Sequence, residues 1–173
     1  VAALDGAVAA GGGGGAGEPD GPLPSGVSGR FIGTSSFTSP RGYPVKRGTM
    51  EIRGTDGETR RFRVNTGGGA STYTRRNGWL PPGVYRISNH RPNRDTPGMV
   101  LDEVGYSFDV DPTSGTDVCG RSLFRIHPDG GSEGTNGCLG VRESANVLED
   151  CETVISELID THGSFNLSVS YQA

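Results

Sequence analysis

One histidine and one cysteine stand eleven positions apart at opposite ends of a glycine-rich stretch of this sequence. His127 lies in a strand-like run from Ser122 to Pro128, and Cys138 follows a turn-rich segment from Gly130 to Gly137. A loop of this composition can fold the chain back and bring an imidazole and a thiol within reach of each other. A neighbouring imidazole raises the ionised fraction of a thiol at neutral pH, and the thiolate is the nucleophile. We therefore predict that Cys138 is a nucleophile and His127 its base.

Each of these two residues also has a simpler interpretation. A lone histidine at a strand end is more often structural, and a lone cysteine is usually a small buried hydrophobe. The surroundings of Cys138 favour chemistry, because Gly137 and Gly140 leave the backbone near the sulfur uncovered and Thr135 and Asn136 add polar groups. Backbone N–H groups at such a turn can hold a developing oxyanion.

The remaining cysteines and histidines predict no metal site. None of the three cysteines forms a CxxC pair and the histidines are scattered, so we expect neither zinc nor another cofactor. His90 lies in a polar run and His162 at the end of an expected helix, so both are expected at the surface. An odd cysteine count suits one reactive thiol plus a Cys119–Cys151 disulfide, or three reduced thiols, and the spacing does not decide between them.

Composition bounds the class of protein. The chain has 173 residues, which suggests one domain, and a net charge of −4, which argues against a general nucleic-acid binder. No run of apolar residues is long enough to span a membrane. Residues 1–28 are dominated by Gly, Ala and Pro, so we expect a disordered tail or linker there and a folded domain over 29–173.

Alternation and turn residues predict a mostly β (α+β) domain. Asp56 and Gly57 stand between two strand-like runs, which is a strong hairpin signal. His90 to Gly98 is expected to be a loop. Strands are expected over Arg30–Phe37, Gly48–Gly54, Glu58–Gly67, Val84–Ile87, two pieces of Met99–Val110, Ser122–Pro128 and Phe165–Tyr171.

One main helix is expected after Cys138. Apolar residues from Val147 to Ile159 recur at helical spacing and form one stripe, which includes Cys151. Ser144 is suited to the N-cap and Gly163 to the C-terminal stop. Cys151 is therefore expected to be buried or bridged rather than catalytic.

Three segments resemble the L,D-transpeptidase (YkuD-type) catalytic domain, and they occur in that family's order. They are RFRVNTGGG (Arg61–Gly69), LPPGVYRI (Leu80–Ile87) and FRIHP…TNGCLGV (Phe124–Val141). The resemblance implies an L,D-transpeptidase-like β-sandwich that acts on peptidoglycan stem peptides in the cell wall. It also implies that Cys138 is the nucleophile, that His127 is the base and that the Gly137 and Cys138 amides help to form the oxyanion hole, with Thr135 in place of the family's Ser or Thr.

The departures from the family pattern favour a wall-cutting enzyme. The His-to-Cys spacing is shorter than usual, Asn136 stands where the family has His, and Gly140 stands where the family has Arg. The family's Arg helps to frame the acceptor side of a transpeptidase. Short-spaced relatives of this fold include the amidase and L,D-transpeptidase-like toxins of type VI secretion. The resemblance thus implies a secreted antibacterial effector that acts in the periplasm and has an immunity protein as a partner.

The expected reaction is attack of the Cys138 thiolate on a stem-peptide carbonyl near the diaminopimelate–D-Ala bond. Water would complete the reaction of an amidase or endopeptidase, and an amine that of an L,D-transpeptidase. A catalytically silent wall-binding module is a third reading. Arg125 shares a strand face with His127 and can hold a substrate carboxylate, or it forms a structural ion pair. Tyr106 and Trp79 line the peptide groove, or belong to the core, which we prefer for Trp79.

Overall fold

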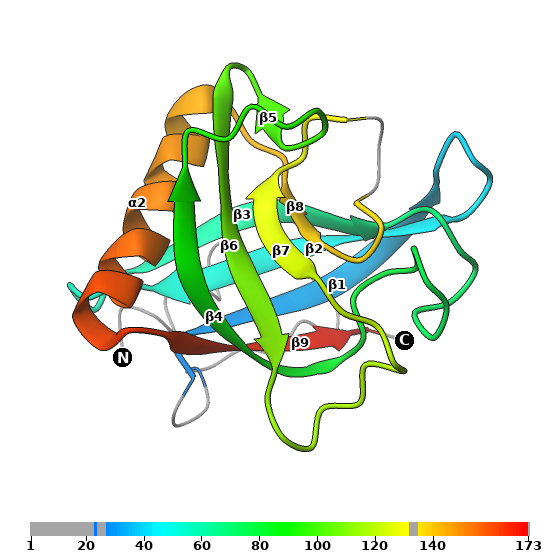
Figure 1. The fold of residues 1–173 in the computed structure, drawn as a ribbon, viewed down its shortest axis with the longest axis horizontal. Coiled ribbons are helices and arrows are strands. Elements are labelled where there is room, and N and C mark those ends of the chain that lie inside the picture. The colour runs from blue at the N-terminus through cyan, green and yellow to red at the C-terminus, as the bar shows by residue number, and fades with distance from the viewer. Residues whose placement is uncertain (1–22, 24–26, 132–134, 173) are drawn as a thin grey trace.

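The computed structural model of the chain describes residue 23 and residues 27–131 and 135–172. It is mostly β, with one helix among the described residues (Figure 1). The expected tail 1–28, except for positions 23, 27 and 28, lies outside the described residues, as do positions 132–134 of the glycine-rich stretch. The elements are β1 (Gly29–Thr38), β2 (Pro44–Arg53), β3 (Thr59–Gly67), β4 (Gly83–Pro92), β5 (Val100–Leu101), β6 (Val104–Pro112), β7 (Phe124–Pro128), β8 (Leu139–Val141), α2 (Ala145–His162) and β9 (Phe165–Tyr171).

The strands pair into a sheet that closes on itself. Their order is β4-β9-β1-β2-β3-β8-β7-β6-β5, and a further pairing of β4 with β6 joins the sheet into a ring. β1 runs parallel to β9 and β7 runs parallel to β8, whereas the other pairs are antiparallel. Figure 1 shows β1, β2 and β3 crossing behind β4, β6 and β7, so the two groups of strands face each other.

Alternation along the strands decides which side chains enter the core. In β7, Phe124 and Ile126 are buried in the core, while Arg125 between them points the other way and is half-buried. In β3, Phe62 and Val64 are likewise part of the core. Successive side chains of a strand point to opposite faces, so the inner face of the sheet is apolar and its outer face is polar. Burial of the inner face is the main stabilising contribution to this fold.

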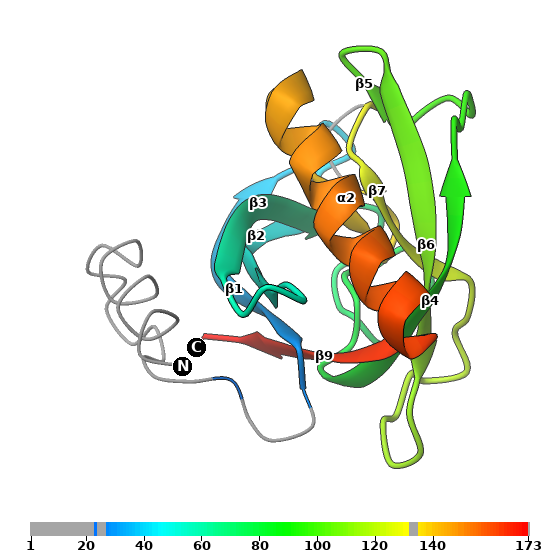
Figure 2. The same ribbon diagram turned by 90° about the vertical axis from the view of Figure 1, so that its left-hand side faces the viewer.

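Helix α2 packs its apolar stripe against β4, β6 and β9 (Figure 2). Its buried residues are Leu148, Cys151, Val154, Ile155 and Leu158. The expected ends are confirmed: Ser144 occupies the N-cap position, although its side chain makes no capping bond, and Gly163 ends the helix with φ of 81°. A left-handed φ of this kind is adopted by glycine at little cost. No helix among the described residues is both long and apolar enough to cross a lipid bilayer.

The mostly β class and the hairpin at Asp56-Gly57 are confirmed, since β2 pairs antiparallel with β3 across that turn. Two expectations about elements were wrong. The run from His90 to Gly98 is not all loop, because β4 continues to Pro92 and pairs there with β6 after a bulge. The strand β8 was not expected, because three residues are too few to display an alternating pattern.

The suggested Cys119–Cys151 disulfide is absent. All three cysteines are free: Cys151 is buried under the sheet, and Cys119 lies exposed in the loop before β7. The Tyr106 side chain lies against the Cys151 thiol on the sheet side. A disulfide would have to carry an exposed loop into the core, which the packing of α2 prevents.

Candidate active site

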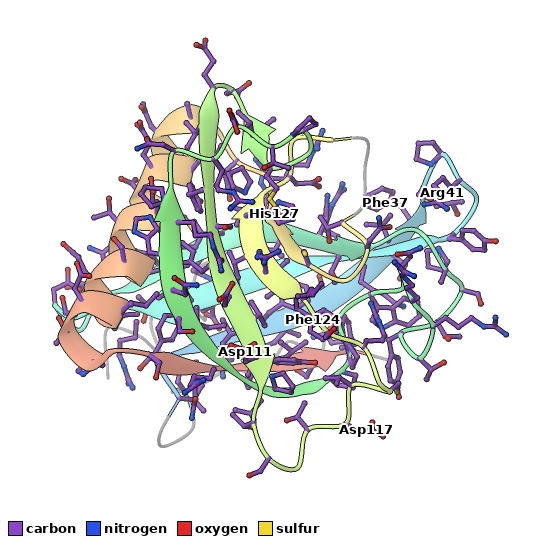
Figure 3. All side chains as sticks on the ribbon, in the orientation of Figure 1. Phe37, Arg41, Asp111, Asp117, Phe124 and His127 are labelled. Atoms are coloured by element: carbon purple, nitrogen blue, oxygen red, sulfur yellow. The ribbon has the colours of Figure 1, made fainter. Side chains whose placement is uncertain are left out.

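The parallel strands β7 and β8 place His127 and Cys138 on one face of the sheet, two residue positions apart along the strands. Ile126 pairs with Leu139 and His127 with Gly140, so extending the register by one residue sets Cys138 opposite Arg125. His127, Arg125 and Cys138 therefore point from the same outer face of the sheet. Figure 3 labels His127 and Phe124 near opposite ends of β7.

A backbone carbonyl orients His127. The ring is buried, with 5% of the residue exposed, and its Nδ1 lies 2.6 Å from the carbonyl oxygen of Pro128. A carbonyl oxygen only accepts hydrogen bonds, so Nδ1 carries the proton and the lone pair lies on Nε2. Nε2 forms no hydrogen bond with any described residue and is available to take a proton.

Burial lowers the pKa of His127 below 6.5, and the Arg125 and Arg94 cations lower it further, although the bond to Pro128 opposes this. Burial also raises the pKa of the Cys138 thiol. A hydrogen bond from the Arg125 amide and the charges of Arg125 and Arg121 lower this pKa, but burial has the larger effect. Both shifts favour the uncharged forms. A neutral thiol and a neutral imidazole suit general-base activation of the nucleophile rather than a preformed ion pair.

The turn before Cys138 is held by its own hydrogen bonds. The Thr135 hydroxyl donates to the carbonyl of Cys138, and the Cys138 amide donates to the carbonyl of Thr135 at 3.2 Å. Asn136 and Gly137 both have left-handed backbones, with φ of 53° and 102°. The Gly137 amide bonds to no described residue, so it can donate to an oxyanion. The Cys138 amide, expected as a second donor, is already engaged.

The three segments that resemble the family meet at this turn. The Thr135 amide donates to the carbonyl of Gly67 at 2.9 Å, at the end of the RFRVNTGGG segment. The Leu80 amide, at the start of LPPGVYRI, donates to the Thr66 hydroxyl at 3.0 Å. Positions that are far apart in the chain thus surround the Cys138 turn.

A groove of about 610 Å³ opens at Cys138. Arg125 lines this groove; its side chain is 25% exposed, and its Nε lies 3.4 Å from the Asp109 carboxylate, which is the ion pair expected under the alternative interpretation. The described lining contains three arginines and no acidic residue. Arg125 already faces Asp109 and Arg121 donates to backbone carbonyls, so among the described lining residues Arg76 remains open to an anionic ligand. Its described lining is Thr74, Arg76, Asn77, Met99, Cys119, Gly120, Arg121, Ser122, Leu123, Phe124, Arg125, Thr135, Asn136 and Cys138.

The two aromatic candidates lie elsewhere. Tyr106 is fully buried on the inner face of β6, so its expected place in the substrate groove was wrong. The parity of the strand explains this, because Tyr106 shares its face with the core residues Phe108 and Val110. Trp79 is half-buried at the surface, where its ring packs against Tyr73 with centroids 6.0 Å apart.

The position of Gly140 has no space for the arginine that the family carries there. A Cβ atom at Gly140 would lie 2.8 Å from the Cβ of Asp129 and would collide with the Thr135 methyl group. Asp129 is buried and accepts a hydrogen bond from the Asn65 amide at 3.2 Å. Its carbonyl accepts another from Arg142 at 3.1 Å. Asp129 therefore anchors the loop beside Gly140 and does not orient His127.

Sequence reasoning missed Arg121, which fastens the loop before β7 to the loop before β4, next to the Cys138 turn. Its guanidinium donates to the carbonyls of Tyr73, Trp79 and Gly78 at 2.5, 2.8 and 2.9 Å. It also lies against Gly137, where any side chain would collide with it. Nothing in the local sequence distinguishes this arginine from a solvated one.

Replacing Arg121 with alanine is expected to destabilise the fold by about 2–3 kcal/mol, because it leaves three carbonyls without their charged donor. The thiol of Cys138 should also react more slowly with iodoacetamide, since a charge that favours its thiolate is lost. Chemical denaturation and alkylation followed by mass spectrometry measure the two effects. Arg76→Ala is the matched control, because Arg76 is exposed in the same groove. Equal stability of the Arg121→Ala and Arg76→Ala variants would contradict the role of Arg121 in joining the two loops.

Comparison with protein-family models, curated proteins and solved structures yields no match for this chain.

Proposed function

We propose that this chain is a cysteine-dependent amidase or endopeptidase that cuts peptidoglycan stem peptides through an acyl-enzyme. The observation that carries the proposal is the placement of Cys138 and His127 on one outer face of β7 and β8, with Cys138 in an arginine-lined groove. Three segments that resemble L,D-transpeptidases supply the substrate class. We propose on the same grounds that the closed sheet is an L,D-transpeptidase-like sandwich.

The proposed reaction starts from the neutral pair. Nε2 of His127 takes the proton of the Cys138 thiol as sulfur bonds to the substrate carbonyl carbon, and the Gly137 amide donates to the resulting oxyanion. Collapse breaks the C–N bond, and the leaving amine takes the proton from Nε2. A water molecule, deprotonated by the same nitrogen, then releases the acyl group and restores the thiol.

Hydrolysis is favoured over transfer by the surroundings of Gly140. The arginine that would frame an acceptor amine is missing, and Asp129 and Thr135 occupy its space. An L,D-transpeptidase on the same fold is the alternative, and a non-catalytic wall-binding module is a third reading. The short His-to-Cys spacing supports a secreted type VI effector that acts in the periplasm and is held in check by an immunity protein.

Mass spectrometry of purified sacculi separates these readings. Sacculi are incubated with the protein in the presence and absence of an added amine acceptor, such as a D-amino acid. Shortened stems in both incubations are the expected result. Stems that carry the added amine would instead identify a transpeptidase. Retained binding to sacculi with no change in any muropeptide would identify a binding module and refute the enzyme.

A further inference from the structure

Leu123, directly before β7, has an unusual backbone conformation for a bulky residue. Its φ is 64°, in the left-handed region where a Cβ crowds the following carbonyl group. Its side chain is also left in solvent, with 78% of the residue exposed. A strained residue that buries almost nothing contributes little to the stability of the fold, so its conformation requires another explanation.

The backbone on both sides of Leu123 is fixed by other contacts. Arg121 is bound to three carbonyls of the loop before β4, and its guanidinium lies 5.2 Å from the ring of the buried Phe124. Glycine would fit position 123 without strain, and the same loop does have glycine at Gly120, where φ is 73°. Leucine at position 123 therefore holds an apolar side chain in solvent, and it does so with a backbone strain that glycine would avoid.

The side chain of Leu123 lines the groove that contains Cys138. Arg76 and Arg125 line the same groove, which has no acidic residue among those described. A ligand that matches this lining has a small apolar group beside a carboxylate: the apolar group covers Leu123, and the carboxylate faces the arginines.

We propose that Leu123 is a specificity-determining residue that contacts a small apolar side chain of the substrate, next to a substrate carboxylate. This inference rests on the proposed function, because it concerns the same groove. In a stem tetrapeptide the terminal D-alanine has both features, a methyl group and a free carboxylate.

The test compares wild type, Leu123→Ala and Leu123→Gly on synthetic stem tetrapeptides that end in D-alanine or in glycine. Tyr43→Ala is the matched control, since Tyr43 is 40% exposed and lies outside the groove. We expect KM for the D-alanine peptide to rise roughly tenfold in both Leu123 variants, with kcat little changed. Wild type should prefer D-alanine to glycine, and the variants should lose that preference. Leu123→Gly should also melt at a higher temperature than wild type, because it relieves the strain.

An unchanged KM and an unchanged preference in the variants would overturn the role of Leu123. So would a lower melting temperature of Leu123→Gly, because Leu123 would then be structural. If wild type cleaves neither peptide, the proposed function fails separately. In that case calorimetry compares binding of the D-alanine peptide to Cys138→Ala and to the Cys138→Ala/Leu123→Ala double variant. This comparison tests the contact of Leu123 without requiring cleavage. Tighter binding with Leu123 present supports the contact, and equal or absent binding overturns it.

Discussion

Replacing Cys138 with alanine is expected to abolish cleavage of stem peptides, with a rate loss of about 10⁴-fold or more. The thiol, which lies directly before β8, supplies the atom that forms the acyl-enzyme. Intact-protein mass spectrometry during turnover should show an acyl adduct on wild type and none on this variant. The fold should persist, because Cys138 is half-buried beside the groove and belongs to no part of the core.

Cys119→Ala is the matched control for this variant. Cys119 is the second thiol that lines the groove, and it is exposed in the loop before β7. Because Cys119 is exposed and lies off the strand face that carries His127, its removal should leave cleavage within about twofold of wild type, as for most surface substitutions. Full activity of Cys138→Ala would refute the proposed enzyme. Loss of activity in Cys119→Ala alone would move the nucleophile to the other thiol.

Replacing His127 with asparagine is expected to lower the cleavage rate by about 10²–10⁴-fold, the usual contribution of a general base. In wild type, activity requires the neutral imidazole. Because burial lowers the pKa of His127 below 6.5, the acid limb of the pH–rate profile should lie below pH 6.5. The variant should lack that limb. A wild-type acid limb well above pH 6.5 would contradict the burial of this base.

The stability of the same two proteins checks His127 independently of activity. In the unfolded chain the histidine takes up its proton near pH 6.5, whereas in the folded protein it does so only at lower pH. The unfolded state therefore binds more protons between these two values, and the free energy of unfolding falls as the pH drops from 6.5 to the folded pKa. Urea denaturation at several pH values should show this loss in wild type and a smaller one in His127→Asn. Identical losses would mean that His127 is not buried as described.

Patterns within one element were readable from the sequence because they report local geometry. The apolar stripe of α2 follows from the helical period, and Gly163 marked its end. The hairpin at Gly57 followed from its turn residues. By contrast, β8 is too short to have a pattern, and its pairing with β7 and β3 depends on chain segments far away in sequence.

Within the candidate site, the residue types and spacing of the sequence determined which two groups could act as nucleophile and base, since thiol and imidazole chemistry belongs to the side chains themselves. Only the tertiary structure decided their protonation states, because burial and the distant Arg94 and Arg121 set the local electrostatics. It also decided that the Pro128 carbonyl orients His127 and that Tyr106 is in the core. Apart from the bond between the adjacent residues His127 and Pro128, these properties arise from contacts between segments distant in the chain, which local sequence patterns do not encode.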